Sequence, residues 1–300
     1  MQRYEQYTAT TVFVTPLYLI TIVLGSFGNA LVIYSYVKDK GIQRSFYFLL
    51  ANFAVADFLI SAVFTPLLFA YRVHERAEFI GYTPLCEISL FTSMCCISLV
   101  YFIFPLMALH RKHVLSRSQH ARLSMPQVCF AMSFFWCLSI LSGVMMVVLA
   151  RREFTDSGPA FLNMYRCLLI NQSLDFYAQV FLGYSMTLTG LSTAITAVIY
   201  SQIYLSLPGN KSSEERQITK TCLWLVLLHT ACWTPFSVLQ VLAVFGTYTE
   251  LHFNLHGMFS AIGVIGSAVA PCLYFAGIPY YRASVHYLFH GRIFQHQKRK

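Results

Sequence analysis

Long runs of apolar residues, separated by short polar segments, follow one another along most of this 300-residue chain. A helix rises about 1.5 Å per residue, so roughly 20 apolar residues cross the hydrocarbon core of a bilayer. Runs of that length occur at residues 12–37, 46–71, 85–109, 126–150, 176–206, 218–246 and 255–277. The pattern therefore predicts seven membrane-spanning helices, numbered as spans one to seven in chain order.

Composition excludes an ordinary water-soluble globule. Hydrophobic residues make up 57% of the chain, charged residues only 11%, and the mean hydropathy is +0.57. A net charge of +9 can indicate a nucleic-acid partner, but here the basic residues gather in alternate loops. With the amino terminus outside, the inward segments hold 15 of the 21 Lys and Arg residues and the outward segments hold six. Since cytoplasmic loops collect basic residues, we expect the amino terminus outside and the carboxyl terminus inside.

This topology divides the chain into three parts. Residues 1–11 are expected to be extracellular, residues 12–277 to form the helix bundle, and residues 278–300 to lie in the cytoplasm. No cleavable signal peptide is evident, so span one is expected to act as its own insertion signal. Of the nine cysteines, only Cys86 and Cys167 lie at outward positions, where oxidation is expected. One disulfide is therefore predicted.

Two polar residues lie at mid-depth in spans one and two. An unpaired amide in hydrocarbon is costly, so Asn29 is expected to face the bundle, where Gly25 and Gly28 permit close helix approach; structural hydrogen bonding is the plainest interpretation. Asp57 is the only acid in the middle of any span, and an ionisable group at that depth typically marks an ion, proton or switching site. The alternative is a neutral carboxyl that Asn29 and Ser267 satisfy.

Short motifs recur at fixed places in successive spans. In chain order they are Gly28-Asn29, Leu50-Ala51 with Ala56-Asp57, Cys86, Arg111, Trp136, Cys167, Cys232-Trp233-Thr234-Pro235 and Pro271-Cys272-Leu273-Tyr274. This order, with Arg111 lying 25 residues beyond Cys86, resembles the rhodopsin-like (class A) G-protein-coupled receptors over nearly the whole chain. The resemblance implies an all-α membrane protein, a seven-transmembrane helix bundle with a short amphipathic eighth helix after Gly277. It also implies a Cys86–Cys167 disulfide.

The resemblance assigns the inner half of the bundle to activation and G-protein coupling. The residues that it places there are Asn29, Asp57, His110, Arg111, Tyr200, Glu215, Pro235, Pro271 and Tyr274. Pro235 is expected to bend span six into a lever whose inner end can swing. Glu215 precedes Pro235 by 20 residues, where family members can carry an acid that pairs with the arginine. We therefore expect an Arg111–Glu215 pair, with a solvated helix-end charge as the alternative.

Several positions depart from the family pattern. Span three carries His110 where an acid normally restrains the arginine, so we expect raised basal signalling. Around Asp57 and Ser267, the family's sodium ligands are replaced by residues without a side-chain oxygen, Val100, Gly266 and Ala270. Because a hard cation needs several oxygen ligands, we expect a degenerate sodium site and no bound metal.

Span three, span five and span six also carry unusual residues below the implied pocket. Tyr101, Ser192 and His229 replace an apolar trio of the family. Span five has no proline near Ser192, which predicts a straighter helix, whereas Pro105 is expected to free a carbonyl near Tyr101. We interpret His229 as a neutral, hydrogen-bonded histidine, with titration there as the alternative.

A ligand pocket in the outer half is the remaining implication. Its expected residues are Leu90, Ser93, Met94, Ile97, Tyr184, Leu188, Trp233, Phe236, Ser237, Gln240, His256, Ser260 and Val264. Ser93 replaces the aspartate of aminergic receptors and Val264 the lysine of opsins, so monoamines are disfavoured and retinal attachment is excluded. We expect a neutral small molecule, a lipid or the end of a short peptide. Asn171 begins an outward glycosylation sequon, while the sequon at Asn210 faces the cytoplasm.

Taken together, these features predict a plasma-membrane receptor that passes ligand binding to a heterotrimeric G protein. An uncoupled decoy, scavenger or dimer partner is the alternative, motivated by His110 and Ala270. A transporter is disfavoured because the span number is odd and Asp57 stands alone. No paired carboxylates, metal-spaced ligands or nucleophile motif indicate an enzyme, and neither a cofactor nor a nucleic-acid partner is expected.

Overall fold

The structure is a computed structural model, and it describes residues 12–38, 44–73, 84–115, 123–154, 176–205, 212–245 and 250–283. Within these ranges every regular element is helical. The helices long and apolar enough to cross a membrane are Val12–Lys38, Ser45–Ala70, Pro84–Leu115, Met125–Leu149, Leu182–Leu205, Ser213–Leu242 and Leu255–Gly277. Each overlaps one predicted run, so the all-α fold with seven spans is confirmed.

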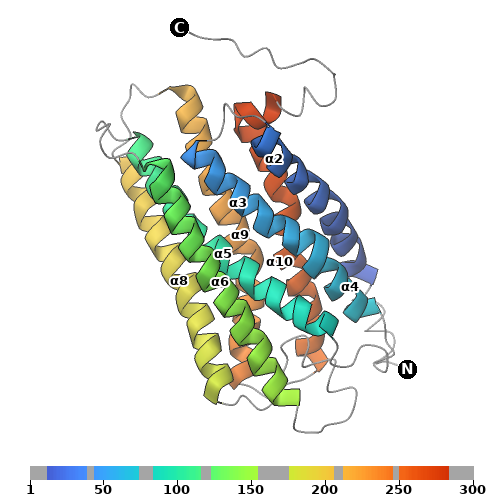
Figure 1. Cartoon of the computed structure of the whole chain (residues 1–300). Coiled ribbons are helices and arrows are strands. Elements are labelled where there is room, and N and C mark those ends of the chain that lie inside the picture. Colours follow the sequence, from blue (N-terminus) through green and yellow to red (C-terminus); the bar gives the residue numbers. More distant parts are fainter. Residues whose placement is uncertain are drawn as a thin grey trace.

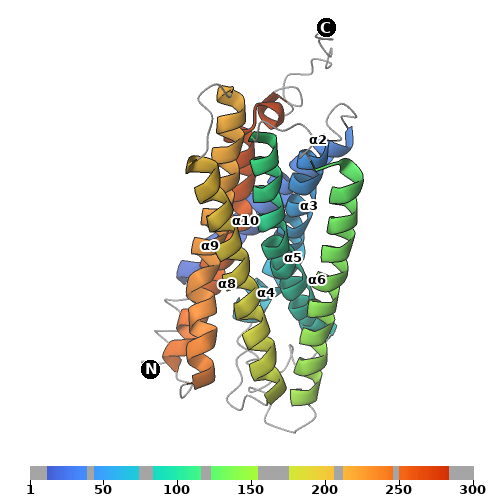
Figure 2. The same cartoon turned by 90° about the vertical axis from the view of Figure 1, so that its left-hand side faces the viewer.

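The elements follow in simple order. After helical residues 12–20 come η1 (Thr21–Gly25), α2 (Ser26–Lys38), α3 (Ser45–Leu59), η3 (Ile60–Phe64), α4 (Thr65–Val73), α5 (Pro84–Leu115), α6 (Met125–Phe154), α8 (Phe176–Leu205), α9 (Ser213–Phe245) and α10 (Glu250–Gly277). Successive spans alternate in direction (Figures 1 and 2). One end of the bundle therefore holds the carboxyl-terminal ends of α2, α5, α8 and α10. Because Arg111 lies there, we call it the Arg111 end.

Span three is the centre of the bundle. Its helix, α5, contacts α3, α6, α8 and α9, and Figure 2 shows it between α9 on one side and α6 on the other. In the most apolar stretch of span three 72% of the residues are buried, compared with 11% in that of span five. The outer helices face lipid with large apolar side chains such as Phe130, which is 78% exposed. Residues on α5 are thus positioned to touch most other spans.

The first two spans each contain one turn of π-helix. These turns, η1 and η3, contact each other. Close approach depends on glycine here, since a Cβ on Gly25 would stand 2.2 Å from the Ser61 hydroxyl oxygen. The Thr65 hydroxyl donates to the Ile60 carbonyl at 2.7 Å, which satisfies one backbone acceptor of η3.

Some helices extend beyond their predicted apolar runs. α5 continues to Leu115 and α9 begins at Ser213, because polar residues near the membrane surface continue a helix that hydropathy alone ends early. α8 is an uninterrupted α-helix without proline, as predicted. After Gly277 and the non-helical Ile278, helix resumes at residues 279–283, where the eighth helix was expected; residues 284–300 lie outside the described part.

Candidate functional site

Arg111 lies near the end of α5 and is only 2% exposed. Its Nη2 atom donates to the Glu215 carboxylate and, at 3.0 Å, to the Glu215 main-chain carbonyl. Nε and Nη2 also donate to Thr219 Oγ1, at 3.2 and 3.1 Å. The Phe46 ring lies 5.2 Å from the guanidinium carbon. The predicted Arg111–Glu215 pair is therefore present and ties α5 to α9.

Thr219 is a partner that sequence reasoning missed. It lies four residues after Glu215 on α9, so both side chains share one helix face. That spacing was a usable signal once Glu215 had been placed opposite the arginine.

His110 does not join this contact. Its Nε2 atom lies 2.9 Å from the Ser45 hydroxyl, and its ring lies 5.7 Å from that of Phe46. The neighbouring Lys112 donates to Gln202 Oε1 at 2.7 Å on the exposed side. The residue that replaces the family's acid is thus bonded to the start of α3, and the restraint of the arginine comes from α9.

Two buried tyrosines accompany Arg111 at the same end of the bundle. Tyr200, on α8, is 3% exposed, and Tyr274, on α10, is fully buried. The Tyr274 ring lies 6.4 Å from Phe53 and 5.9 Å from Tyr281. Burial also raises the pKa of the Tyr281 phenol, which lies beyond span seven. The structure therefore brings three predicted coupling residues to one end, from three different helices.

Asp57 is fully buried in the middle of the bundle, and its carboxylate contacts two other spans. Its Oδ1 atom accepts a hydrogen bond from the Ser267 hydroxyl at 2.9 Å and lies 3.1 Å from Nε2 of His229. The Ser267 contact was expected. The His229 contact was not, although an ionisable residue at similar depth in each of two spans was a signal for it.

Asn29 is not a partner of Asp57, so that part of the alternative proposed from sequence is wrong. Its Nδ2 atom donates to the main-chain carbonyls of Gly25 and Ser267, both at 2.9 Å. It therefore joins span one to span seven through the backbone, which fits the structural role expected of it. Close packing supports this contact, since a Cβ on Gly28 would stand 2.7 Å from Pro271.

The residues around Asp57 do not fit a sodium ion. Val100, Gly266 and Ala270 have no side-chain oxygen with which Asp57 and Ser267 could complete a coordination shell. Among the described residues, no group of three or more His, Cys, Asp or Glu side chains could hold a metal.

Pro105 has the effect on span three that the sequence predicted. Proline has no N–H to give the Tyr101 carbonyl, and the Ser192 hydroxyl of α8 donates to that oxygen instead. Span five thus has a serine in place of the family's proline, and this serine supplies the hydrogen bond that Pro105 removes from span three.

The predicted ligand residues lie in the outer half, and some of them meet. Phe236 lies 5.8 Å from Trp233 and 5.0 Å from His256, ring centre to ring centre, which joins α9 to α10. Leu90, Ser93, Trp233, His256, Ser260 and Val264 are buried; Met94, Ile97, Leu188, Phe236, Ser237 and Gln240 are half-buried; Tyr184 is exposed.

Hydrogen bonds link two of these residues to side chains that the sequence did not single out. The Tyr184 hydroxyl lies 2.8 Å from that of Ser142, and the Ser260 hydroxyl lies 3.0 Å from that of Tyr18. Ser93 donates to the Leu90 carbonyl at 3.0 Å, within its own helix.

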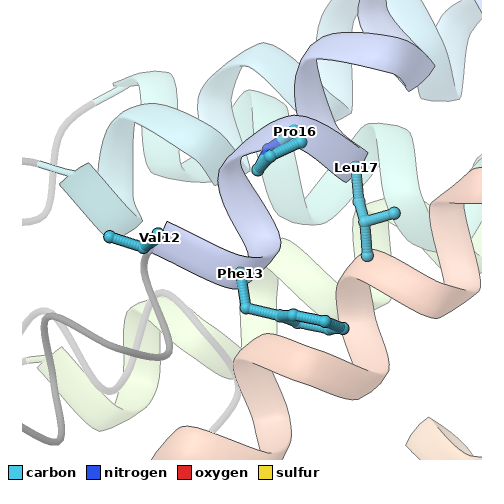
Figure 3. Close-up of a pocket in the computed structure, with 4 residues that line it drawn as sticks. All are labelled: Val12, Phe13, Pro16 and Leu17. Carbon is cyan, nitrogen blue, oxygen red and sulfur yellow. The ribbon is translucent and has the colours of Figure 1, made fainter.

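An apolar groove of about 710 Å³ lies elsewhere, at the start of span one. Val12, Phe13, Pro16 and Leu17 line it, and Figure 3 shows Phe13 and Leu17 pointing toward α10. None of the predicted ligand residues lines this groove. Its wholly hydrocarbon lining suits the lipid chains that such a face meets in a membrane.

The structure also shows how two further family markers, Trp136 and Cys86, are bonded. Trp136 donates from Nε1 to Asn52 Oδ1 at 2.9 Å, which joins α6 to α3. Cys86 is buried and disulfide-bonded, whereas Cys95, Cys96, Cys129, Cys137, Cys222, Cys232 and Cys272 are free. Cys167 and Asn171 lie outside the described residues, so the pairing of Cys86 and the glycosylation remain predictions.

Comparison with known proteins identifies one family. The model of "7 transmembrane receptor (rhodopsin family)" matches residues 28–274. The "G-protein coupled receptor homolog FPV027" of fowlpox virus is 23% identical over 285 residues, which cover 88% of this chain and 80% of that protein. The rat somatostatin receptor type 1 is 22% identical over 88% of this chain and 68% of its own length. The crystal structure of squid rhodopsin has a TM-score of 0.72 at 18% identity, covering 97% of this chain and 88% of that one.

Proposed function

Because the chain belongs to the rhodopsin family of seven-transmembrane receptors, we propose that it passes the binding of an extracellular ligand to a heterotrimeric G protein. The plasma membrane is the site that such a function requires. The distribution of basic residues supports an extracellular amino terminus, which places the Arg111 end in the cytoplasm.

The contact of Arg111 with α9 is the observation that carries this proposal. A guanidinium that is 2% exposed is held by Glu215 and Thr219, at the end of a helix that contains Pro235. If the segment of α9 before Pro235 swings away, Arg111 loses these partners and becomes available to a protein that enters between the helices. Tyr200 and Tyr274 lie at the same end of the bundle.

Raised basal signalling is part of the proposal. His110 is bonded to Ser45 and gives the arginine no carboxylate, so the ionic restraint depends on Glu215. The Glu215 side chain is 37% exposed, and an ion pair that water reaches this easily contributes little to stability.

Nucleotide exchange on a panel of purified G proteins tests coupling. We expect the wild type to accelerate exchange on at least one of them without added ligand, and Arg111→Ala to abolish that acceleration. Lys112→Ala is the matched control, because it removes the adjacent positive charge, whose partner Gln202 lies on the exposed side. Equal loss in both variants, or no acceleration by a correctly folded wild type, would refute the proposal.

An uncoupled decoy, scavenger or dimer partner is the second candidate. It is favoured by His110 and by Ala270, since these residues replace an acid and an asparagine that the family usually carries in its inner motifs. Ligand binding and internalisation without nucleotide exchange on any G protein of the panel would support it.

For the ligand, we propose a neutral small molecule, a lipid or the end of a short peptide. No acid occurs in the implied pocket set, and the Ser93 hydroxyl donates to its own helix, so the desolvation of an ammonium group would go uncompensated. A thermal-shift screen with matched amines and neutral analogues tests this. Stronger stabilisation by the amines would contradict it.

A further inference from the structure

The contacts of His229 determine how many protons the Asp57–His229 pair holds. Nδ1 lies 3.1 Å from the main-chain oxygen of Leu225, which can only accept, so Nδ1 carries a hydrogen. Nε2 lies 3.1 Å from Asp57 Oδ1, which also only accepts when the carboxyl is ionised. This contact is a hydrogen bond only if one further proton lies between the two atoms, bound to either of them. The pair then has no net charge.

The pair is shielded from water. The exposed fractions of the His229 and Asp57 side chains are 1% and 0%. The rings of Phe53 and Phe104 lie 4.9 and 6.0 Å from the imidazole, centre to centre. Asp57 Oδ2 has no hydrogen-bond partner in the described part of the chain. An unpaired carboxylate at this position would be buried with no exposure to bulk water.

The pair also joins three helices. Asp57 belongs to α3 and His229 to α9, while Ser267 of α10 donates to the same Oδ1 atom. His229 precedes Pro235 in the chain, so it lies on the part of α9 that leads to the Arg111 end. A swing of this segment would separate Nε2 from Oδ1.

We propose that the proton shared by Asp57 and His229 takes the place of a metal cation at mid-depth, neutralising the carboxyl and clamping α9 to α3 and α10. The release of this clamp on activation depends on the proposed function. The clamp itself does not, and it can be tested with neither a ligand nor a G protein. His229 acts here as a positioning residue for α9.

A double-mutant cycle on the purified full-length receptor tests the clamp. Asp57→Leu and His229→Phe are each expected to lower Tm by at least about 5 °C, because each leaves one buried polar partner unpaired. The double variant is expected to lose clearly less than the sum of the two shifts. Additive shifts would overturn the proposal.

The matched control is Leu227→Phe, which introduces the same side chain at a lipid-facing position of α9 that is 46% exposed. It is expected to leave Tm within about 1 °C of the wild type. A loss as large as that of His229→Phe would show that α9 does not tolerate the new ring, and the proposal would lose its support.

Two further measurements test the position of the proton and the role of sodium, and the second of them needs no variant. In receptor labelled with ¹⁵N-histidine, His229, assigned with His229→Gln, is expected to show a hydrogen on Nδ1 and a hydrogen-bonded Nε2. An Nε2 nitrogen without a hydrogen bond would overturn the proposal. Replacing sodium by choline at constant ionic strength is expected to change Tm by no more than about 1 °C. A sodium-specific stabilisation of several degrees would mean that a metal, rather than a proton, neutralises Asp57.

Discussion

Two of the polar contacts that tie α9 to other helices, Arg111–Glu215 and Asp57–His229, differ in their access to water. At the Arg111 end, the Glu215 side chain is 37% exposed, so water can replace the arginine when the pair opens. In the middle of the bundle, Asp57 and His229 are almost completely buried, so bulk water does not reach them and cannot replace either partner. We therefore expect the bundle to open more readily at the Arg111 end than in its middle, where removal of one partner leaves the other buried and unpaired.

Asp57→Leu should have the largest effect on stability. We expect the free energy of unfolding to fall by about 3–5 kcal/mol, because His229 and Ser267 are left without their buried acceptor. Thermal or denaturant unfolding in detergent measures this. A loss no greater than that of Glu215→Ala would remove the contrast between the two regions.

Gly28→Ala tests whether the middle is also tightly packed. A Cβ at this position would stand 2.7 Å from Cβ and 2.8 Å from Cγ of Pro271, whose ring cannot turn aside. We expect a loss of about 1–3 kcal/mol in the free energy of unfolding. Gly190→Ala is the matched control, because a Cβ there meets nothing within 4 Å, and it should be neutral or slightly stabilising.

Ser192→Ala removes the hydroxyl that donates to the Tyr101 carbonyl. Because Pro105 supplies no N–H, this buried oxygen would lose its bond, and we expect a loss of about 1 kcal/mol. Restoring the helical donor with Pro105→Ala in the same chain should recover most of it. Unfolding of the single and double variants measures both steps, and no recovery would contradict the explanation.

Glu215→Ala should have the smallest effect on stability and a clear effect on signalling. We expect a change of about 0–1 kcal/mol in the free energy of unfolding, since the acid is partly exposed and Thr219 still bonds the arginine. Basal nucleotide exchange should rise severalfold. Unchanged exchange, in a variant that reaches the cell surface normally, would show that this contact does not restrain the receptor.

The course of the helices could be predicted well from sequence, because lipid requires long apolar runs whatever their neighbours are. Helix ends were less predictable: α5 and α9 continue through polar turns that hydropathy counts as loop. The Arg111–Glu215 pair followed from family spacing. The carbonyl freed by Pro105 followed from proline chemistry, which is local.

Contacts that depend on how helices are rotated against one another were harder to predict. Asp57 and His229 are 172 residues apart, and nothing in the sequence near either residue shows that their side chains share a direction. For the same reason, Ser142 and Tyr18 were missed as partners of predicted pocket residues. Depth along the membrane could be read from the sequence, but the direction of a side chain around its helix could not.

The π-helical turn η3 changes the direction in which the later side chains of span two point. A π-turn holds one residue more than the α-turn that it replaces, so everything after Phe64 is rotated by about 100° relative to an ideal helix drawn through Asp57. A helical wheel drawn for span two would therefore assign to Leu67 the direction in which Leu68 points, and to Leu68 the direction in which Phe69 points. Deleting one residue from Ile60–Phe64 should realign α4 with that wheel, and it would present a different set of side chains at the end of the bundle opposite the Arg111 end.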